Sequence, residues 1–292
     1  MIVEHEYDGK KVFILACSSC NVVCKHCYIN FKGDMGLEKL VTTIYALKDR
    51  YVLNITGAEL LIDSEYVRRI TESNQKGFMT NGLALYKNVN LLDKLLEWGV
   101  KYVALSYHHM VQEEYSPIPK YKVEWVIKEL ITRRIDVSLM STVTKVNYDK
   151  IDDACRIAES LGAKRIHFTN FTAQGNARKI SDMWKLNDKE IQVFFERYRE
   201  CVENYPNLIV EKCCSFGKDV NEPCAQVCAA GKDKVAITPD GNVYPCFFLA
   251  EKGNEIGRFD NGIITIFREI DWDGTDCLSK RVLNYNGALN YK

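Results

Sequence analysis

The first two-thirds of the chain alternate short β-branched or aromatic runs with longer stretches whose apolar residues recur at helical spacing. The short runs predict six strands, at residues 12–16, 51–56, 77–80, 100–106, 136–143 and 165–169. The helical spacing predicts helices at residues 37–47, 123–131, 151–161 and 191–202. A capping box of Asn187 and Glu190 is expected at the start of the last helix.

Strand–helix units of roughly 30 residues each predict a parallel sheet with right-handed crossovers. They are fewer than the eight units of a closed barrel, so we expect an α/β fold with a partial (β/α)6 TIM-like barrel. After about residue 208 the chain becomes rich in cysteine and turns, with a hairpin predicted around 239–241 and one helix at 263–270. The expected domains are the partial barrel at 1–215 and a small cysteine-rich domain at 216–292.

Composition and charge narrow the function. The 292 residues carry a net charge of zero and are 47% apolar, which suits a soluble protein with a full core. The charge balance gives no sequence-wide case for nucleic acid or membrane binding. No apolar run approaches the roughly 20 residues that span a bilayer. The first residues lack the pattern of a signal peptide, so a reducing, cytoplasmic location is expected.

The chain contains 12 cysteines, and in a reducing compartment such a number indicates metal ligation or catalysis rather than disulfides. Cys155 and Cys201 fall on apolar helix faces and are interpreted as small buried hydrophobic residues. The remaining ten form an early and a late group: Cys17, Cys20, Cys24 and Cys27, then Cys213, Cys214, Cys224, Cys228, Cys246 and Cys277.

The early group lies in "CSSCNVVCKHCY", directly after the first predicted strand. Its two C-x2-C pairs are too close together for a zinc ribbon, which separates them by about a dozen residues or more. Cys20, Cys24 and Cys27 instead form C-x3-C-x2-C, and three thiolates can hold a cubane cluster while one iron stays open. A structural zinc site that uses His26 is the open alternative, and Cys17 is expected to be a strand-end residue.

This motif after a first strand resembles that of the radical SAM enzymes, with His26 where the family commonly has an aromatic residue. The resemblance implies a [4Fe-4S] cluster on Cys20, Cys24 and Cys27, with S-adenosylmethionine (SAM) at the open iron. It implies that an electron, from an external donor such as flavodoxin or ferredoxin, cleaves SAM to methionine and a 5′-deoxyadenosyl radical. That radical would abstract a hydrogen atom from the substrate.

Other strand ends resemble the same family, and active-site groups gather at such ends in α/β barrels. "ITGAEL" stands where the family has Gly-Gly-Glu, so Gly57, Ala58 and Glu59 are expected to receive the ammonium group of SAM. A simple strand-to-helix turn is the alternative. In "LSYHH", Ser106 matches a residue near the SAM ribose, and His108 replaces the acidic residue of the family.

His108 and His109 are expected to face either substrate or solvent. Candidates for contacts with SAM or substrate at later strand ends are Ser141, Asn147, Gln174 and Arg178.

In the late group, Cys228, Gly241 and Cys246 form C-x12-G-x4-C around the predicted hairpin. This resembles the opening half of the SPASM or twitch extension of radical SAM enzymes. Because Cys277 alone follows Cys246, the shorter twitch-like form with one auxiliary [4Fe-4S] cluster is favoured. The implied ligands are Cys224, Cys228, Cys246 and Cys277, and zinc is the alternative.

The roles of Cys213 and Cys214 are left open. They are inert, or one replaces Cys224 as a ligand, or one donates a hydrogen atom to a substrate radical.

The resemblance favours modification of a ribosomally made peptide by cross-linking, oxidation or epimerisation. The alternative is oxidation of a small molecule in cofactor or natural-product biosynthesis. An iron–sulfur electron-transfer protein and a zinc-stabilised binding module are more remote. The cluster motif begins at residue 20, without the N-terminal leader-binding domain of many peptide-modifying relatives. This favours a small substrate, or a peptide delivered by a separate partner.

Overall fold

The computed structural model describes residues 4–73, 75–217, 219, 228–284 and 289–291. All six predicted strands form, each end within two residues of its expected place. They are β2 (Lys11–Leu15), β3 (Val52–Thr56), β4 (Gly77–Thr80), β5 (Tyr102–Ser106), β6 (Asp136–Val143) and β7 (Arg165–Asn170). A further strand, β8 (Ile209–Lys212), pairs in parallel with β7 and was not predicted.

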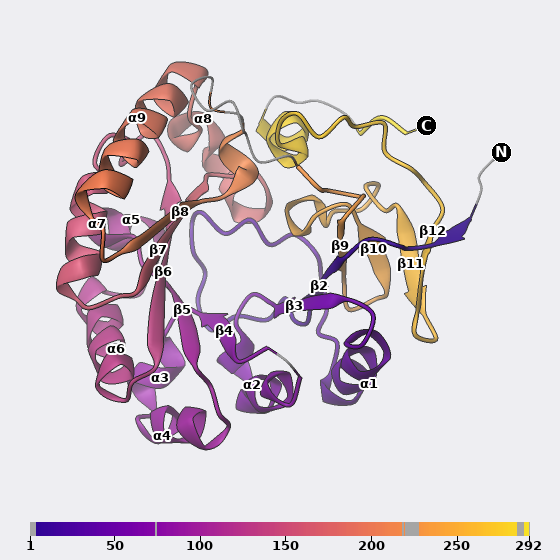
Figure 1. Cartoon of the computed structure of the whole chain (residues 1–292), viewed down its shortest axis with the longest axis horizontal. Helices are drawn as coiled ribbons and strands as arrows, with labels where there is room; N and C mark the ends of the chain where they lie inside the picture. The colour runs from indigo at the N-terminus through magenta and orange to yellow at the C-terminus, as the bar shows by residue number, and fades with distance from the viewer. Residues whose placement is uncertain (1–3, 74, 218, 220–227, 285–288, 292) are drawn as a thin grey trace.

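The helices lie along the outer side of a curved wall of strands (Figure 1). They are α1 (Leu37–Leu47), α2 (Ser64–Thr71), α3 (Leu83–Lys87), α4 (Asn90–Glu97), α5 (Gln112–Tyr115), α6 (Lys120–Thr132), α7 (Ile151–Ser160), α8 (Ser181–Trp184) and α9 (Asp188–Asn204). Short 3-10 helices are η1 (Leu60–Ile62), η2 (His109–Val111), η3 (Gly175–Ile180), η4 (Cys214–Phe216) and η5 (Phe247–Leu249), and η6 (Lys280–Asn284) is a short π-helix.

Two sheets make up the wall. Strands β4 to β8 form a parallel sheet in sequence order. Strands β2 and β3 pair in parallel within a second sheet, so the expected α/β fold with parallel strands is confirmed. Among the described residues, no helix is long and apolar enough to cross a membrane.

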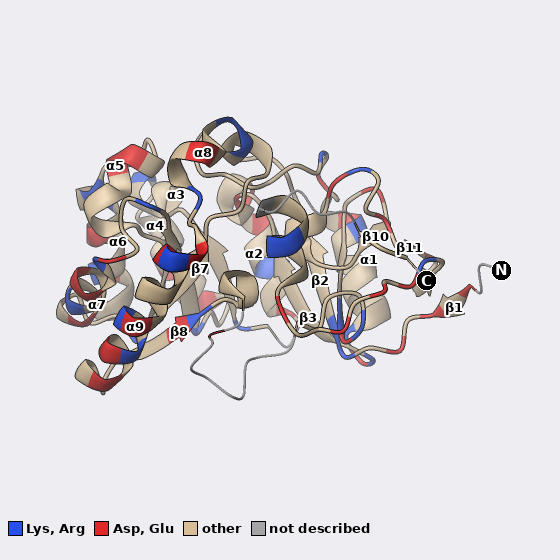
Figure 2. Cartoon of the chain, turned by 90° about the horizontal axis from the view of Figure 1, so that it is seen from above, with Lys and Arg blue, Asp and Glu red and all other residues tan. Residues whose placement is uncertain are grey.

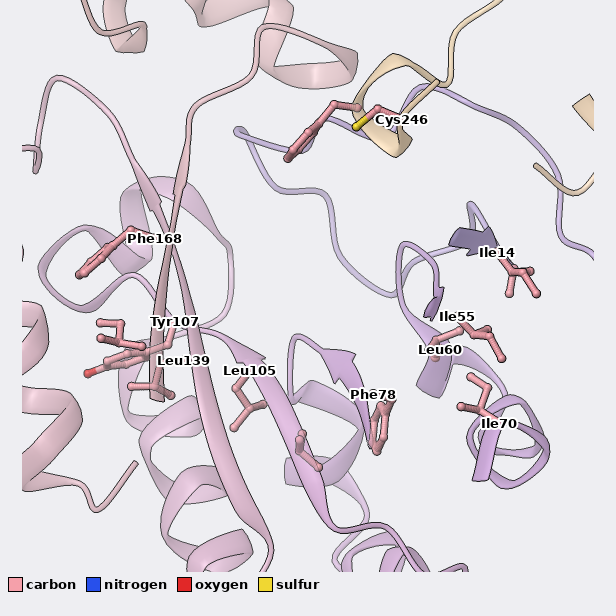
Figure 3. Close-up of a cluster of buried hydrophobic side chains, with 14 of the residues drawn as sticks. Ile14, Ile55, Leu60, Ile70, Phe78, Leu105, Tyr107, Leu139, Phe168 and Cys246 are labelled. Carbon is pink, nitrogen blue, oxygen red and sulfur yellow. The ribbon is translucent and has the colours of Figure 1, made fainter. Parts of the chain in front are cut away.

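The predicted apolar faces form the core. In Figure 3, Leu105, Leu139 and Phe168 point from β5, β6 and β7 toward the surrounding helices, and all three are fully buried. Cys155 and Cys201 are buried in the same core, which confirms their interpretation as small hydrophobic residues. Acidic and basic residues alternate on the outer helices, for example on α7 and α9 (Figure 2).

The helix α9 begins as predicted. The backbone N–H of Glu190 donates to Asn187 Oδ1 at 3.0 Å, and the N–H of Asn187 donates to Glu190 Oε2 at 2.7 Å. This capping box satisfies backbone donors that the first turn of a helix leaves free.

The C-terminal strands join the N-terminal ones in a single sheet. The hairpin predicted around 239–241 connects β9 (Lys234–Ile237) to β10 (Asn242–Tyr244), and β9 pairs in parallel with β2. The seven strands run in the order β1-β12-β11-β10-β9-β2-β3, where β1 is His5–Glu6, β11 is Gly257–Asp260 and β12 is Ile263–Ile266. Backbone hydrogen bonds between β9 and β2 thus connect the two expected domains within one sheet. The boundary expected at 215/216 stays a prediction.

The helix predicted at 263–270 is wrong. Residues Ile263–Ile266 form strand β12, antiparallel to β11. Asn261 and Gly262 have φ angles of 48° and 80°, the left-handed pair that a two-residue hairpin turn requires. Three of the four residues of β12 are isoleucine and the fourth is threonine, and β-branched residues favour a strand.

Candidate active site at the carboxyl ends of the strands

A cavity of about 230 Å³ lies at the carboxyl ends of the parallel strands. The loop after β2 crosses the concave side of the strands (Figure 1) and supplies Cys20, Cys24 and Cys27 to the cavity wall. Ser106, at the end of β5, lies in the same wall. The strand geometry thus brings together residues that are far apart in the sequence.

Hydrogen bonds from its backbone N–H groups hold the cysteine loop in place. The N–H groups of Ser18 and Ser19 donate to Asp34 Oδ1 at 2.9 and 3.1 Å. Burial opposes ionisation of Asp34, but the hydrogen bonds from Ser19 and Ser18 hold the pKa of its carboxyl below the usual value. Farther along, Lys25 N donates to Tyr115 O at 2.9 Å. The loop is therefore anchored on both sides of Cys20.

The three thiols share one electrostatic environment. Burial raises the pKa of Cys24 to about 11, and the charges of Cys27 and Cys20 act in the same direction. Burial also raises the pKa values of Cys20 and Cys27. Such thiols need a positive group between them to ionise together, and iron supplies one.

The donor set fits an iron–sulfur cluster. Three thiols line one cavity, and each would bind a different iron of a cubane. In the part of the chain that the structure describes, no three His, Cys, Asp or Glu side chains could hold a single metal ion. Cys17 is buried, and its thiol donates to Glu59 O at 3.6 Å, so it lies apart as a residue beyond the strand end.

The residues of the "GAE" segment, Gly57 to Glu59, differ in whether they contact the cavity. Gly57 and Ala58 line the cavity, whereas Glu59 does not. A Cβ on Gly57 would lie 2.5 Å from Cys17 Sγ, so the close approach of this buried cysteine requires the glycine.

Glu59 is 1% exposed and binds three protein donors. Its Oε1 accepts from Leu61 N at 2.9 Å and Thr80 Oγ1 at 2.8 Å, and its Oε2 accepts from Asn81 N at 2.8 Å. Burial raises its pKa, while these hydrogen bonds oppose the rise. The carboxylate thereby ties the end of β3 to the end of β4.

Of the other residues expected to contact SAM or substrate, some line the cavity and some do not. Ser106 and Ser141 line the cavity. Asn147 does not: its Oδ1 accepts from Thr144 N at 2.8 Å and its Nδ2 donates to Thr142 O at 3.1 Å, which closes a turn.

Arg178 and Gln174 also lie outside the cavity wall. Arg178 pairs with Glu251 at 2.9 Å and links η3 to the C-terminal part. Gln174 is buried, and its Oε1 has no hydrogen-bond partner among the described residues.

His108 is a buried donor in the cavity wall. It is 4% exposed, and its ring lies edge-on to His26 with the centroids 4.5 Å apart. Burial lowers the pKa of His26 to about 4 and that of His108 well below its usual value, which favours the neutral form of both rings.

Because His108 Nδ1 accepts from Thr142 N at 3.1 Å, its proton lies on Nε2. That nitrogen has no partner among the described residues. A buried donor of this kind fits an acceptor oxygen of a bound ligand. The solvated alternative for His108 is therefore wrong, while His109 is partly exposed.

Some residues of the cavity wall were not predicted. They include Tyr28, His167, Asn170, Phe247 and Phe248. Tyr28 and Asn170 adjoin predicted features, the cysteine motif and the end of the strand at 165–169, and that position was the available signal. Phe247 and Phe248 come from η5, which no local pattern connects with the barrel strands.

The described cysteines of the late group also lie together. Cys213, Cys228 and Cys277 are close enough to Cys214 for their thiols to lower its pKa together. Cys246 is buried nearby, and burial raises its pKa to about 11. Cys224 lies outside the described residues.

This second thiol group adjoins the cavity and contains a cation. Cys213 lines the cavity itself, whereas Cys214, Cys228, Cys246 and Cys277 do not. Lys234 Nζ lies 3.8 Å from Cys214 Sγ. Burial would lower the pKa of Lys234, but the interaction of its charge with the ionised forms of the nearby cysteines, first Cys246, outweighs burial and raises the pKa.

Known proteins resemble the chain in sequence and in fold, although no family model matches it. The antilisterial bacteriocin subtilosin biosynthesis protein AlbA of Bacillus subtilis (strain 168) is 25% identical over 263 residues, which are 85% of this chain and 57% of AlbA.

Among solved structures, Streptococcus suis SuiB bound to its precursor peptide SuiA matches with a TM-score of 0.70 and 14% identity, over 88% of this chain and 63% of SuiB. Native anSMEcpe with bound AdoMet and the Cp18Cys peptide matches with a TM-score of 0.63 and 18% identity, over 86% of this chain and 77% of that one.

These structures share the fold of the chain. The chain spans less than two-thirds of the length of AlbA and of SuiB. In its fold, in its C-x3-C-x2-C loop in the wall of the cavity and in its sequence similarity to AlbA, the chain resembles the radical SAM enzymes, a class whose cofactors are SAM and a [4Fe-4S] cluster.

Proposed function

We propose that this enzyme abstracts a hydrogen atom from a peptide substrate and thereby modifies the peptide. The observation that carries the proposal is the cavity in which Cys20, Cys24 and Cys27 meet residues from the ends of five parallel strands, β3 to β7. When bound, the cluster and SAM supply a 5′-deoxyadenosyl radical. The protein's share is to hold the cofactors, orient the substrate and exclude water.

Several cavity residues are proposed to position SAM. Gly57 and Ala58 would offer backbone groups, and Ser106 and Ser141 would offer hydroxyls. The Nε2–H of His108 would donate to an oxygen of the ligand, since it has no other partner among the described residues. Glu59 would act indirectly by holding the ends of β3 and β4 together.

Aromatic side chains would close the cavity on the side of the C-terminal strands. The Tyr28 ring packs against Phe248, with centroids 4.9 Å apart, and Phe247 packs against Phe248 at 4.2 Å. All three rings line the cavity. An apolar wall of this kind shields a reactive radical from water.

The peptide substrate is inferred from the relatives. AlbA is named for bacteriocin biosynthesis, and the SuiB and anSMEcpe structures hold peptides. Cross-linking, oxidation and epimerisation are all compatible with a hydrogen abstraction. Oxidation of a small molecule is the second candidate, because the described cavity is small, about 230 Å³.

We further propose that β2 to β7 form a partial (β/α)6 barrel and that residues 216–292 hold one auxiliary cluster. The described cysteines of the late group support this, because they come from several chain segments and lie close together. Cys228, Cys246 and Cys277 would be ligands, together with Cys224 or Cys214. A flavodoxin or ferredoxin would supply electrons.

Anaerobic reconstitution tests the proposal. We expect about four irons and four sulfides per cluster, and release of 5′-deoxyadenosine once a reductant and SAM are added. Alanine at Cys20, Cys24 or Cys27 should abolish the release, whereas the matched Cys155→Ala variant, in the helical core, should retain it.

Other results would contradict the proposal. Iron without SAM cleavage would indicate an electron-transfer protein, and zinc without cluster absorption would indicate a binding module. A deuterated peptide that transfers no deuterium to 5′-deoxyadenosine, beside a small molecule that does, would favour the second candidate.

A further inference from the structure

Lys234 places a positive charge inside the second thiol group. Its Nζ lies 3.8 Å from Cys214 Sγ, and Cys246, Cys228 and Cys213 are the other thiols close enough for their ionised forms to interact with its charge. No carboxylate forms an ion pair with Lys234 in the described ranges. The ammonium group therefore has sulfur as its neighbour, where a lysine ordinarily has water or a carboxylate.

The backbone fixes this lysine in place. Lys234 is the first residue of β9 and pairs in register with Lys11 of β2. Its N–H donates to Ala229 O at 3.1 Å, and its C=O accepts from Gly231 N at 2.9 Å. These bonds close a turn that begins directly after Cys228. Main-chain geometry thus fixes where the Lys234 side chain begins relative to this cysteine, and the contact with Cys214 Sγ places its ammonium group.

We propose that Lys234 raises the reduction potential of the auxiliary cluster, an inference that rests on the presence of that cluster in the proposed function. The potential of an iron–sulfur cluster depends on its net charge and on hydrogen bonds to its sulfurs. A fixed cation next to the ligands favours the reduced cluster, which carries one more negative charge. Partial burial of Lys234 strengthens the effect, because solvent screens the charge less.

The test is a redox titration of the auxiliary cluster alone, followed by electron paramagnetic resonance. The full chain with Cys20, Cys24 and Cys27 all replaced by alanine removes the other cluster. In this background, Lys234→Met should make the reduction equilibrium at least tenfold less favourable, a shift of about 59 mV to lower potential for one electron. Lys232→Met, which removes an exposed cation two residues away, should leave the potential unchanged.

Lys234→Arg separates charge from packing. It keeps the positive charge, so the potential should return toward that of the parent chain. If Lys234→Met fails to load a cluster, Lys234→Gln, which is also neutral, replaces it and should show the same lowered potential. Equal potentials for the neutral variant and the parent would overturn the inference, as would loss of loading in all three variants, which would indicate a packing role.

The test also separates the inference from the proposed function. If the triple alanine background binds no iron while the unsubstituted chain still releases 5′-deoxyadenosine, there is no auxiliary cluster for Lys234 to act on. That result would overturn the inference and leave hydrogen abstraction standing.

Discussion

Glu59 belongs to a segment that resembles a family motif, and it also stabilises the fold through its own hydrogen bonds. Its carboxylate accepts from two backbone N–H groups and one hydroxyl, all protein donors, at the junction of β3 and β4. Removal of the carboxylate would leave these donors unpaired in a buried place. A buried donor without a partner costs about 1–3 kcal/mol.

We therefore expect Glu59→Ala to lower the free energy of unfolding at pH 7 by at least about 2 kcal/mol. Urea denaturation followed by circular dichroism would measure the loss. Glu38→Ala, at an exposed position in the first turn of α1, is the matched control and should stay within about 0.5 kcal/mol of the parent. A Glu59→Ala variant as stable as this control would contradict the role.

The same residue predicts a pH dependence. Because burial raises the pKa of Glu59 above 4.5, the native state binds more protons than the unfolded state between 4.5 and the native pKa. The pH-dependent part of the stability that Glu59 contributes is therefore full below pH 4.5 and is lost as the pH rises through the native pKa, whereas its hydrogen bonds contribute on both sides. The stability difference between the parent and Glu59→Ala should grow on acidification through this window, whereas a difference that shrinks would contradict the raised pKa.

At the scale of single residues, the sequence indicated which residues form a local motif, but not which contacts they make across strands. The cysteines of the C-x3-C-x2-C motif were found because their spacing is local. The reason for Gly57 was not, because the atom that a Cβ would meet belongs to Cys17, on the neighbouring strand end. The unpartnered nitrogen of His108 also depends on a contact across strands, from Thr142. Spacing along the chain carries no record of such contacts.

At the scale of elements, periodicity predicted the parallel strands and most of the long helices, and it failed at 263–270. There the apolar residues of β12 and the residues after them can be placed on a helix as well as on a strand. The decisive signal was the preceding Asn261-Gly262 pair, whose φ angles of 48° and 80° form the hairpin turn. At this segment the turn-forming residues Asn261 and Gly262 were a better guide to the structure than the spacing of the apolar residues.

This hairpin gives a direct prediction. Gly262→Ala forces an alanine into the left-handed region, which costs about 1–2 kcal/mol for a residue with a Cβ. The new Cβ would also lie 3.3 Å from Ala46 Cβ. Thermal or urea unfolding should show the loss, whereas Asn261→Gly, at the adjacent left-handed position, should be tolerated. If both variants had the stability of the parent, the turn would not have the conformation described.

At the scale of the whole molecule, the parallel pairing of β9 with β2 joins parts of the chain that the sequence separates by more than 200 residues. Local patterns could not predict it, which is why a boundary at 215/216 was expected. Val12 and Ile14 of β2 share one buried core with Val235 and Ile237 of β9. Both ends of the chain thus contribute to a common sheet and a common core.

A common core predicts one cooperative unfolding transition. The chain has four tryptophans, and Trp272 is the one that follows residue 215. In a chain with Trp98, Trp125 and Trp184 replaced by phenylalanine, fluorescence would report the C-terminal part. The circular dichroism of the helices, α1 to α9, would report the N-terminal part. The two signals should share one midpoint in urea, because coincident transitions are the mark of a single unit. An earlier Trp272 transition would show that the C-terminal segment unfolds by itself, and the boundary expected from the sequence would then be correct despite the shared sheet.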